Sequence, residues 1–434
     1  MTIRNRKKFF YGWVIVGVCG LLMFLNAGCA FYAFGIFLKP IAADIGCTRG
    51  EVSITLAIVM ILSAIPAPVV AVAISKYGAR KLIIFSMILF AIGLALLSTI
   101  TQLWQLWLFS GIVGMAIAFG IFLPITTTIN FWFVKRRAFA MGIAMSSVGI
   151  GTFVLAPIIA HLIDIIGWRS TWLVLAVIVL ILGVIPSLIF FKNKPADIGE
   201  VPDGISHSVL KEQSVHPPVK KTFITPVEWE VRAALKTKTL WMIVIVAFTN
   251  IFALSMSNAH LVPYLNDIGL SSVVAAGSLG LLLGISTLGR LVGGYLGDII
   301  EPRYLIALAC SMEAIGFPIL INLQNIGLVY LYIYIVLFGI GVGIILVLQP
   351  VILAAYYGTK GFSRLIAIVM VILVPVGAIS PVFGGYVYDA VHSYTIPFGI
   401  CAGLCALGAI CAILAHPPTP PPHIKSLIKP KYFS

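Results

Sequence analysis

Residues 273–296 read VVAAGSLGLLLGISTLGRLVGGYL, an apolar stretch whose only charged residue is Arg290. The stretch is long enough to cross the hydrocarbon core of a bilayer, which takes about 20 helical residues. A guanidinium group keeps its proton at any ordinary pH, so burying it in hydrocarbon is costly. Charged side chains in membrane helices almost always face a water-filled path and mark a site for a substrate or an ion. The stretch therefore predicts a membrane helix that carries a functional arginine.

The composition indicates that the chain crosses the membrane many times. Hydrophobic residues make up 61% of the 434 residues and charged residues 10%, which is more apolar surface than a soluble protein of this length can bury. The net charge is +14, but the charges lie between the apolar runs, and this distribution argues against a nucleic-acid partner. The seven cysteines have no spacing typical of a metal site or a disulfide framework, so we expect no metal and no cofactor.

Apolar runs bounded by charged or turn residues predict an all-α membrane protein with twelve transmembrane helices. We expect an N-terminal six-helix bundle (1–191), a polar, Pro-rich linker (192–238), a C-terminal six-helix bundle (239–415) and a tail (416–434). The twelve runs fall near 10–38, 51–75, 81–101, 104–131, 138–164, 170–191, 239–265, 272–297, 303–323, 327–357, 362–389 and 394–415.

Lysine and arginine residues predict the orientation of these helices. There are 28 of them, and Arg290 lies within a helix. Lys39, Arg49 and Arg169 lie on one side, and all the others lie on the side that holds the linker and both terminal segments. Cytoplasmic loops carry the excess of positive charge, so we expect both termini and the linker in the cytoplasm.

The two halves repeat each other. SKYGARKLI begins at Ser75 and DIIEPRYLI at Asp298, 223 residues later. WFVKRRAFAMG begins at Trp132 and YYGTKGFSRLI at Tyr356, 224 residues later. Two six-helix halves joined by a cytoplasmic linker are typical of secondary transporters, which bind their substrate between the halves near the bilayer midplane.

These motifs resemble those of the major facilitator superfamily, and within it the monocarboxylate porters and, slightly less, the oxalate/formate exchangers. Residues 11–13 (Tyr-Gly-Trp) are similar to a shortened form of the first porter signature, and residues 132–144 match the second signature at every spacing. Asp298-x-x-x-x-Arg303 resembles the gate motif of the superfamily, whereas the first half has Ser75 in place of the Asp. The resemblance implies the major facilitator fold.

The resemblance also implies roles for the charged residues. Both porter families carry an Arg eight residues before the gate Asp and use it to bind the substrate carboxylate; here that residue is Arg290. Eight residues correspond to about 12 Å of helix, which places Arg290 near the midplane of the membrane. A structural alternative is that Arg290 pairs with Glu313. Asp298, Arg303, Arg136 and Arg137 are the gating candidates.

Further polar residues are candidates for lining the substrate cavity. Where the animal porters place an Asp one turn before the Arg, this chain has Ser286, and where they place a Lys in the first helix, alignment gives Tyr32. We expect Tyr32, Asn26, Asn258 and Ser286 to line the cavity. One fixed positive charge suits a monoanion better than a dianion, whose second carboxylate would be buried without a partner.

A coupled proton has three candidate carriers: the substrate carboxylate itself, His260 and Glu313. Histidine changes charge near neutral pH, which favours His260 as a titrating group. Glu313 is the one carboxylate well inside the ninth predicted helix (303–323). Each also has a structural alternative, as a hydrogen-bonded histidine near a helix end and as an acid paired within its own bundle.

The sequence therefore predicts a secondary active transporter of small monocarboxylates such as lactate or pyruvate. We expect it to act with a proton, as a monomer in the plasma membrane. Carboxylate exchange of the oxalate/formate type remains the alternative. A membrane-embedded enzyme and a nucleotide-driven pump are disfavoured, because the chain has no HExxH, no Asp-rich motif and no GxxxxGK[ST].

Overall fold

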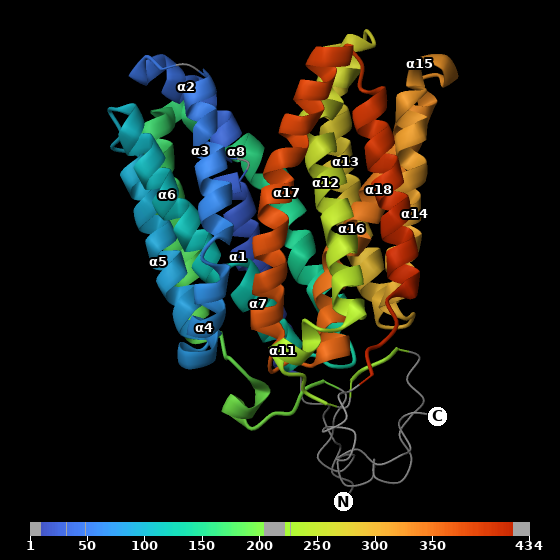
Figure 1. Ribbon diagram of the computed structural model, residues 1–434. Coiled ribbons are helices and arrows are strands. Elements are labelled where there is room, and N and C mark those ends of the chain that lie inside the picture. Colours follow the sequence, from blue (N-terminus) through green and yellow to red (C-terminus); the bar gives the residue numbers. More distant parts are fainter. Residues whose placement is uncertain (1–9, 32, 48, 204–221, 226, 420–434) are drawn as a thin grey trace, which may run out of the picture.

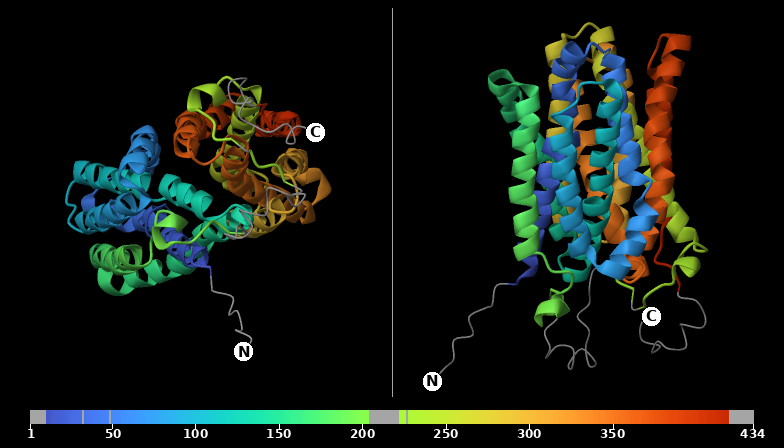
Figure 2. Two further views of the ribbon diagram at one scale, coloured as in Figure 1. Left: turned by 90° about the horizontal axis from the view of Figure 1, so that it is seen from below. Right: turned by 90° about the vertical axis from the view of Figure 1, so that its left-hand side faces the viewer.

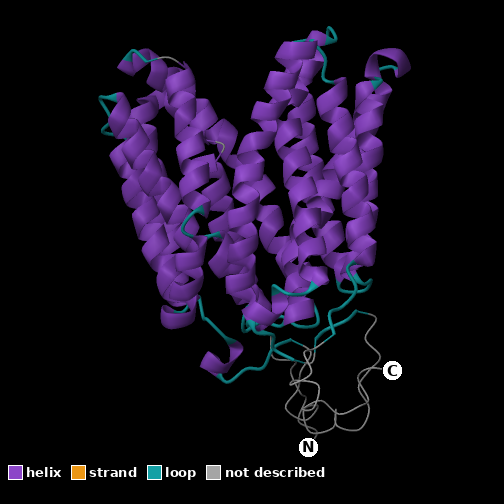
Figure 3. Ribbon diagram, in the orientation of Figure 1, coloured by secondary structure: helices purple, strands orange, loops and turns teal. Residues whose placement is uncertain are grey.

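The computed structural model describes residues 10–31, 33–47, 49–203, 222–225 and 227–419, and these residues form helices and loops without strands (Figure 3). The helices stand side by side in two groups that match the two halves of the chain (Figures 1 and 2). The first group consists of α1 (Gly12–Asn26), η1 (Ala27–Phe31), α2 (Ala33–Ile45), α3 (Arg49–Ala64), α4 (Ala67–Tyr77), α5 (Ala79–Leu97), α6 (Leu103–Gly120), α7 (Phe122–Trp132), α8 (Arg137–Val179), η2 (Leu180–Val184) and α9 (Ile185–Ile189).

The second group follows the linker, which contains η3 (Pro195–Ile198) and the short helix α11 (Val231–Ala234). It consists of α12 (Lys238–Asp267), α13 (Ser272–Gly297), α14 (Pro302–Ile321), α15 (Leu323–Ile326), α16 (Val329–Tyr357), α17 (Phe362–Val391) and α18 (Thr395–Leu414).

The described helices account for the twelve predicted crossings. Ten are long and apolar enough to span a membrane, and α3 with α4, bent by 44°, supplies an eleventh. The longest apolar stretch, Arg137–Ile189, has 53 residues, too many for one crossing. Gly167 interrupts it with φ 77° and ψ 161°, a conformation that costs little only for glycine, and so divides it into two spans. The predicted fold class is confirmed.

The first predicted helix differs from expectation in its shape. It is continuous in the sequence pattern but consists of α1, a π-helical turn (η1) and α2, which continues to Ile45. Single π-helical turns inside α-helices are frequent at functional sites. Tyr32, the cavity candidate next to this turn, lies outside the described residues.

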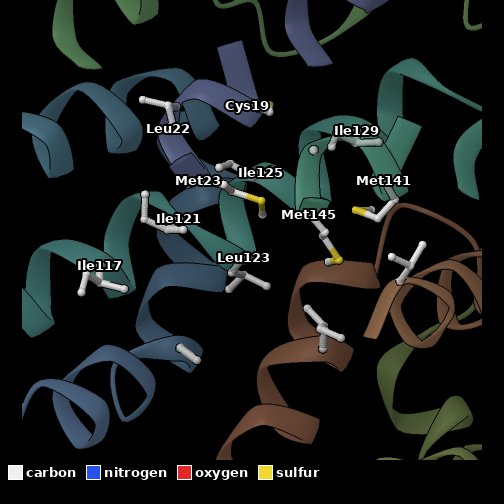
Figure 4. Close-up of a cluster of buried hydrophobic side chains, with 14 of the residues drawn as sticks. Cys19, Leu22, Met23, Ile117, Ile121, Leu123, Ile125, Ile129, Met141 and Met145 are labelled. Carbon is white, nitrogen blue, oxygen red and sulfur yellow. The ribbon is translucent and has the colours of Figure 1, made fainter. Parts of the chain in front are cut away.

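Close packing of apolar side chains holds each half together. Figure 4 shows part of the first half, where Met23 of α1, Ile125 of α7 and Met145 of α8 lie near one another. All three are buried, with exposed fractions between 0% and 5%. In a bilayer such contacts act through van der Waals packing rather than through removal of apolar surface from water.

The two halves meet chiefly where α8 of the first half packs against α13 of the second, and also where α4 packs against α17. The ribbons of the two halves lie together at the end that carries the linker and diverge toward the opposite end (Figure 1). The helix with Arg290, α13, packs between α8 and α16. This places the predicted functional arginine at the junction of the halves.

Candidate functional site

Glycines allow α8 and α13 to touch through their backbones. A Cβ atom on Gly142 would lie 2.7 Å from the carbonyl oxygen of Arg290, and one on Gly294 would lie 2.7 Å from that of Ala138. No larger residue fits at either position without moving a helix. Small residues at such crossings let membrane helices approach closely. We call this contact, residues 138–149 of α8 with 287–298 of α13, the α8–α13 crossing.

Arg290 connects the two halves at this crossing. Its Nη1 donates to the carbonyl oxygen of Met145 on α8, at 2.9 Å, and the side chain is half-buried. One turn away, the Ser146 hydroxyl donates to the carbonyl oxygen of Thr287 at 3.3 Å. The guanidinium therefore lies at the interface of the two bundles. Met145 was not a sequence candidate, because a backbone acceptor leaves no mark in the sequence.

Asp298 forms the end of the crossing nearest the linker. Its carboxylate accepts hydrogen bonds from the backbone N–H groups of Ala138 (2.8 Å) and Phe139 (3.0 Å), in the first turn of α8. A carboxylate at this position satisfies otherwise unpaired N–H groups and interacts favourably with the helix dipole. Burial raises the pKa of the Asp298 carboxyl from 3.8 to about 6, although the two N–H donors lower it.

A second carboxylate, Asp203, holds the loop just before α8. It accepts from the backbone N–H groups of Lys135 (2.8 Å) and Arg136 (2.7 Å) and from that of Val134. Asp203 was not among the sequence candidates. Its position between Pro202 and Gly204 is a turn signal, but only the fold brings that turn to this loop.

The two arginines of this loop behave differently. The Arg136 side chain is exposed. Arg137 is 5% exposed, and its guanidinium donates to the carbonyl oxygens of Phe133 (3.0 Å) and Asn130 (3.4 Å) at the end of α7. Arg137 is therefore the buried cation at the linker end of the crossing.

Asn26 on α1 and Arg290 on α13 lie at different depths along the two bundles. Gly20 of α1 faces Ser147 of α8. Asn26 lies about 9 Å beyond Gly20, away from the linker, whereas Met145, the partner of Arg290, lies about 3 Å toward it. Asn26 is buried, and its Nδ2 has no hydrogen-bond partner among the described residues.

The remaining cavity candidates lie on α12 and α13. The hydroxyl of Ser286 donates to the carbonyl oxygen of Leu283 on its own helix, at 2.8 Å. Asn258 is exposed on α12. His260 lies 2.8 Å, through Nε2, from the carbonyl oxygen of Pro381 on α17.

Glu313 and Arg303 lie within the second bundle, apart from the crossing. Glu313 is fully buried, and its carboxyl group accepts from Nδ2 of Asn250 (2.8 Å) and from Sγ of Cys405 (3.5 Å). Arg303 contacts His416 and the Tyr304 hydroxyl near the linker end. The structure thus gathers Arg290, Asp298 and Arg137 at one crossing and leaves the other charged candidates outside it.

A family model described as Major Facilitator Superfamily matches residues 19–321 and 285–431. The chain belongs to the major facilitator superfamily. The resemblance to its monocarboxylate porters is confirmed as well: monocarboxylate transporter 12 of Rattus norvegicus is 28% identical over 419 residues, covering 90% of this chain and 82% of the relative. Monocarboxylate transporter 2 of Homo sapiens is 30% identical over 175 residues, covering 39% of this chain and 35% of the relative.

Solved structures agree with this superfamily fold. The fucose:proton symporter of Escherichia coli superimposes with a TM-score of 0.70 at 15% identity, covering 94% of this chain and 100% of that one. A proton:xylose symporter superimposes with a TM-score of 0.70 at 13% identity, covering 92% and 94%. At these identities the likeness concerns the fold alone. The chain is a multi-pass membrane transporter of the superfamily.

Proposed function

We propose that this transporter is a secondary active carrier of small monocarboxylates, of the size of lactate or pyruvate. The observation that carries the proposal is the position of Arg290 at the junction of the two bundles, where a membrane helix of one half donates a hydrogen bond to the other. A guanidinium there offers a carboxylate a charge-assisted, bidentate partner. The similarity to monocarboxylate transporters supports the same substrate class.

The substrate carries one negative charge. Arg290 is the cation of α13 within its span, and the position that matches it in the first half is Ala67, 223 residues earlier. The first half therefore offers no matching cation to a second carboxylate of the substrate. That carboxylate would lose its hydration in the cavity without compensation. Monocarboxylates compete for the site better than oxalate or succinate.

Transport follows alternating access with the linker on the cytoplasmic side of the plasma membrane. Lys and Arg residues concentrate on the linker side. The halves touch there through the α8–α13 crossing and diverge at the other end (Figure 1), which is the arrangement of an outward-facing state. Opening to the cytoplasm then requires Asp298 to leave the N-terminus of α8.

The coupling proton travels with the substrate. Ser286 replaces the acid of the animal porters, and its hydroxyl is bound to its own helix. Glu313 is enclosed by the second bundle, and His260 contacts Pro381. A carboxylate paired with Arg290 stays ionised, so it takes up its proton as the pair separates during release.

Purified protein in liposomes tests this function. Uptake of labelled lactate or pyruvate is expected to rise with an inward proton gradient in the wild type, in Glu313→Gln and in His260→Gln. Uptake that ignores the gradient but rises when carboxylate is loaded on the far side would establish exchange instead. Loss of the gradient response in Glu313→Gln alone would place the proton on Glu313. A dicarboxylate that competes tenfold better than lactate would refute the proposed substrate valence.

A further inference from the structure

A small cavity lies inside the second bundle, at its linker end. Residues of α12, α14, α16 and the end of α18 line it, among them Arg303, Gln349 and Ala412. The centre of a water molecule can occupy about 10 Å³ of this cavity. The whole empty volume, which includes the opening to solvent, is about 260 Å³. A cavity of this size holds one water-sized species. It is a different place from the α8–α13 crossing.

Two residues that line this cavity each carry a hydrogen-bond donor without a protein acceptor among the described residues. The donors are Nε of Arg303 and Nε2 of Gln349, and both atoms are shielded from solvent. Gln349 as a whole is 9% exposed. A buried polar group that the protein leaves unsatisfied destabilises the fold, so a bound water molecule or ion is expected beside it. Both groups are donors, so the missing partner is an acceptor.

The charge of Arg303 indicates what kind of hydrogen-bond acceptor the cavity binds. The one ion pair within 4 Å among the described residues joins Arg169 to Asp44, so Arg303 has no carboxylate at that distance. Its Nη atoms contact His416 and Tyr304. Glu301, two residues earlier, uses its carboxylate to accept from Phe223 N–H (2.7 Å) and the Tyr356 hydroxyl (2.9 Å). A cation without a counter-ion in a partly apolar cavity favours an anion over water.

The matching positions of the first half differ from the residues of this cavity. Arg80 matches Arg303 in the repeat and donates to the carbonyl oxygen of Leu188. Its Nε is also without a described partner. The position that matches Gln349, however, is the buried Ile125, which has no donor and packs in the apolar cluster of Figure 4. The first half therefore has no side-chain donor at the position that matches Gln349.

We propose that Arg303 and Gln349 form a binding site for a small monovalent anion of halide size, which neutralises Arg303 and ties α14 to α16. The site lies beside the start of the tail, where the Thr239 hydroxyl donates to the carbonyl oxygen of His416 at 2.8 Å. Anion binding therefore stabilises the linker end of the second bundle. This inference does not depend on the substrate of transport.

Thermal unfolding of the purified full-length protein tests the site, with chloride or bromide titrated against sulfate at constant ionic strength. We expect a saturable rise in Tm of about 2–4 °C with the halides and none with sulfate. Gln349→Leu and Arg303→Gln should each lose this halide-dependent rise, while Arg80→Gln, the matched control in the first half, should keep it. The readout is the halide dependence, so a change in the absolute Tm of a variant does not affect the conclusion.

A second measurement locates the anion directly. Crystals grown in bromide should show an anomalous peak between Nε of Arg303 and Nε2 of Gln349. Equal stabilisation by sulfate, or a halide response that persists in both variants, would overturn the proposal and leave a water molecule in the cavity. Saturation only near molar halide would mean an adventitious ion.

Discussion

The α8–α13 and α4–α17 crossings are the two contacts between the halves that the internal repeat relates to each other, but they are built differently. At the first, Gly142 and Gly294 bring the backbones into contact, and Asp298 caps α8 from the opposite half. At the second, none of the close glycine contacts among the described residues bridges α4 and α17. Ser75, which matches Asp298, donates instead to the carbonyl oxygen of Val72 on its own helix, at 2.7 Å.

The internal repeat therefore preserves the arrangement of the helices but not the chemistry of the gate residues. The loop before α17 is held from the linker, where the carboxylate of Glu228 accepts from the Lys360 N–H at 2.7 Å. Among the described residues of these two crossings, a carboxylate from the opposite half binds only at the start of α8. The α8–α13 crossing is therefore the one held by a carboxylate from the opposite half, and we call it the latched crossing.

The largest expected effect comes from the arginine that only one crossing carries. Arg290→Ala should lower monocarboxylate uptake about 100-fold or more, because it removes a charge-assisted partner of the substrate. Arg290→Lys should restore it only in part, since an ammonium cannot form the bidentate pair. Ala67→Ser at the matching position should leave uptake within about twofold. Unchanged uptake by well-folded Arg290→Ala protein would show that Arg290 does not bind the substrate carboxylate.

Next in size is the effect of separating the backbones at the latched crossing. Gly142→Ala places a Cβ 2.7 Å from the Arg290 carbonyl oxygen and 3.1 Å from Cα of Gly294, so the helices must move apart. Overpacking of this kind costs about 1–3 kcal/mol, which should shift the protein toward the inward-facing state. Spin-label distances across the linker end measure the shift. Gly17→Ala, with no atom within 4 Å of the added Cβ, serves as the control and should not change them.

Substitutions at Asp298 and Ser75 should change the ratio of the closed to the open state by a smaller amount. Asp298→Ala leaves two N–H groups of α8 unpaired, which should open the latched crossing by about 1 kcal/mol, or roughly fivefold in population. Ser75→Asp should favour closure of the α4–α17 crossing by about 0.3–1 kcal/mol, provided that the new carboxylate reaches the N-terminus of α17. The same spin-label distances report both. If both variants shifted the populations in the same direction, the latch would not depend on these caps.

The smallest effect is a pH dependence confined to the latched crossing. Burial raises the pKa of Asp298 to about 6, against 3.8 for a hydrated carboxyl, so the closed crossing binds this proton more tightly than the open one. The closed fraction should rise as pH on the linker side falls from about 6 to about 4, and this gain should be lost as pH rises through 6. Asp298→Asn should abolish the response. A closed fraction that falls on acidification would show that the two N–H bonds outweigh burial.

The features that the sequence alone predicts are clearest along α13. Hydropathy gave its span, the repeat gave the place of Asp298, and the spacing between the two gave the depth of Arg290. The span and the depth depend on the cost of moving each residue of the chain from water into hydrocarbon. The twelve crossings followed for the same reason, whereas the superfamily followed from the resemblance of residues 132–144 and of Asp298-x-x-x-x-Arg303 to its motifs.

Contacts between distant residues needed the tertiary structure. Met145 accepts from Arg290, Asp203 holds the loop before α8, and Gln349 faces the same cavity as Arg303. Each pairing joins residues 45 or more positions apart, so it depends on how each helix is rotated about its axis and how closely its neighbours approach. Local propensity and hydropathy do not fix those two quantities; the packing of the two bundles does.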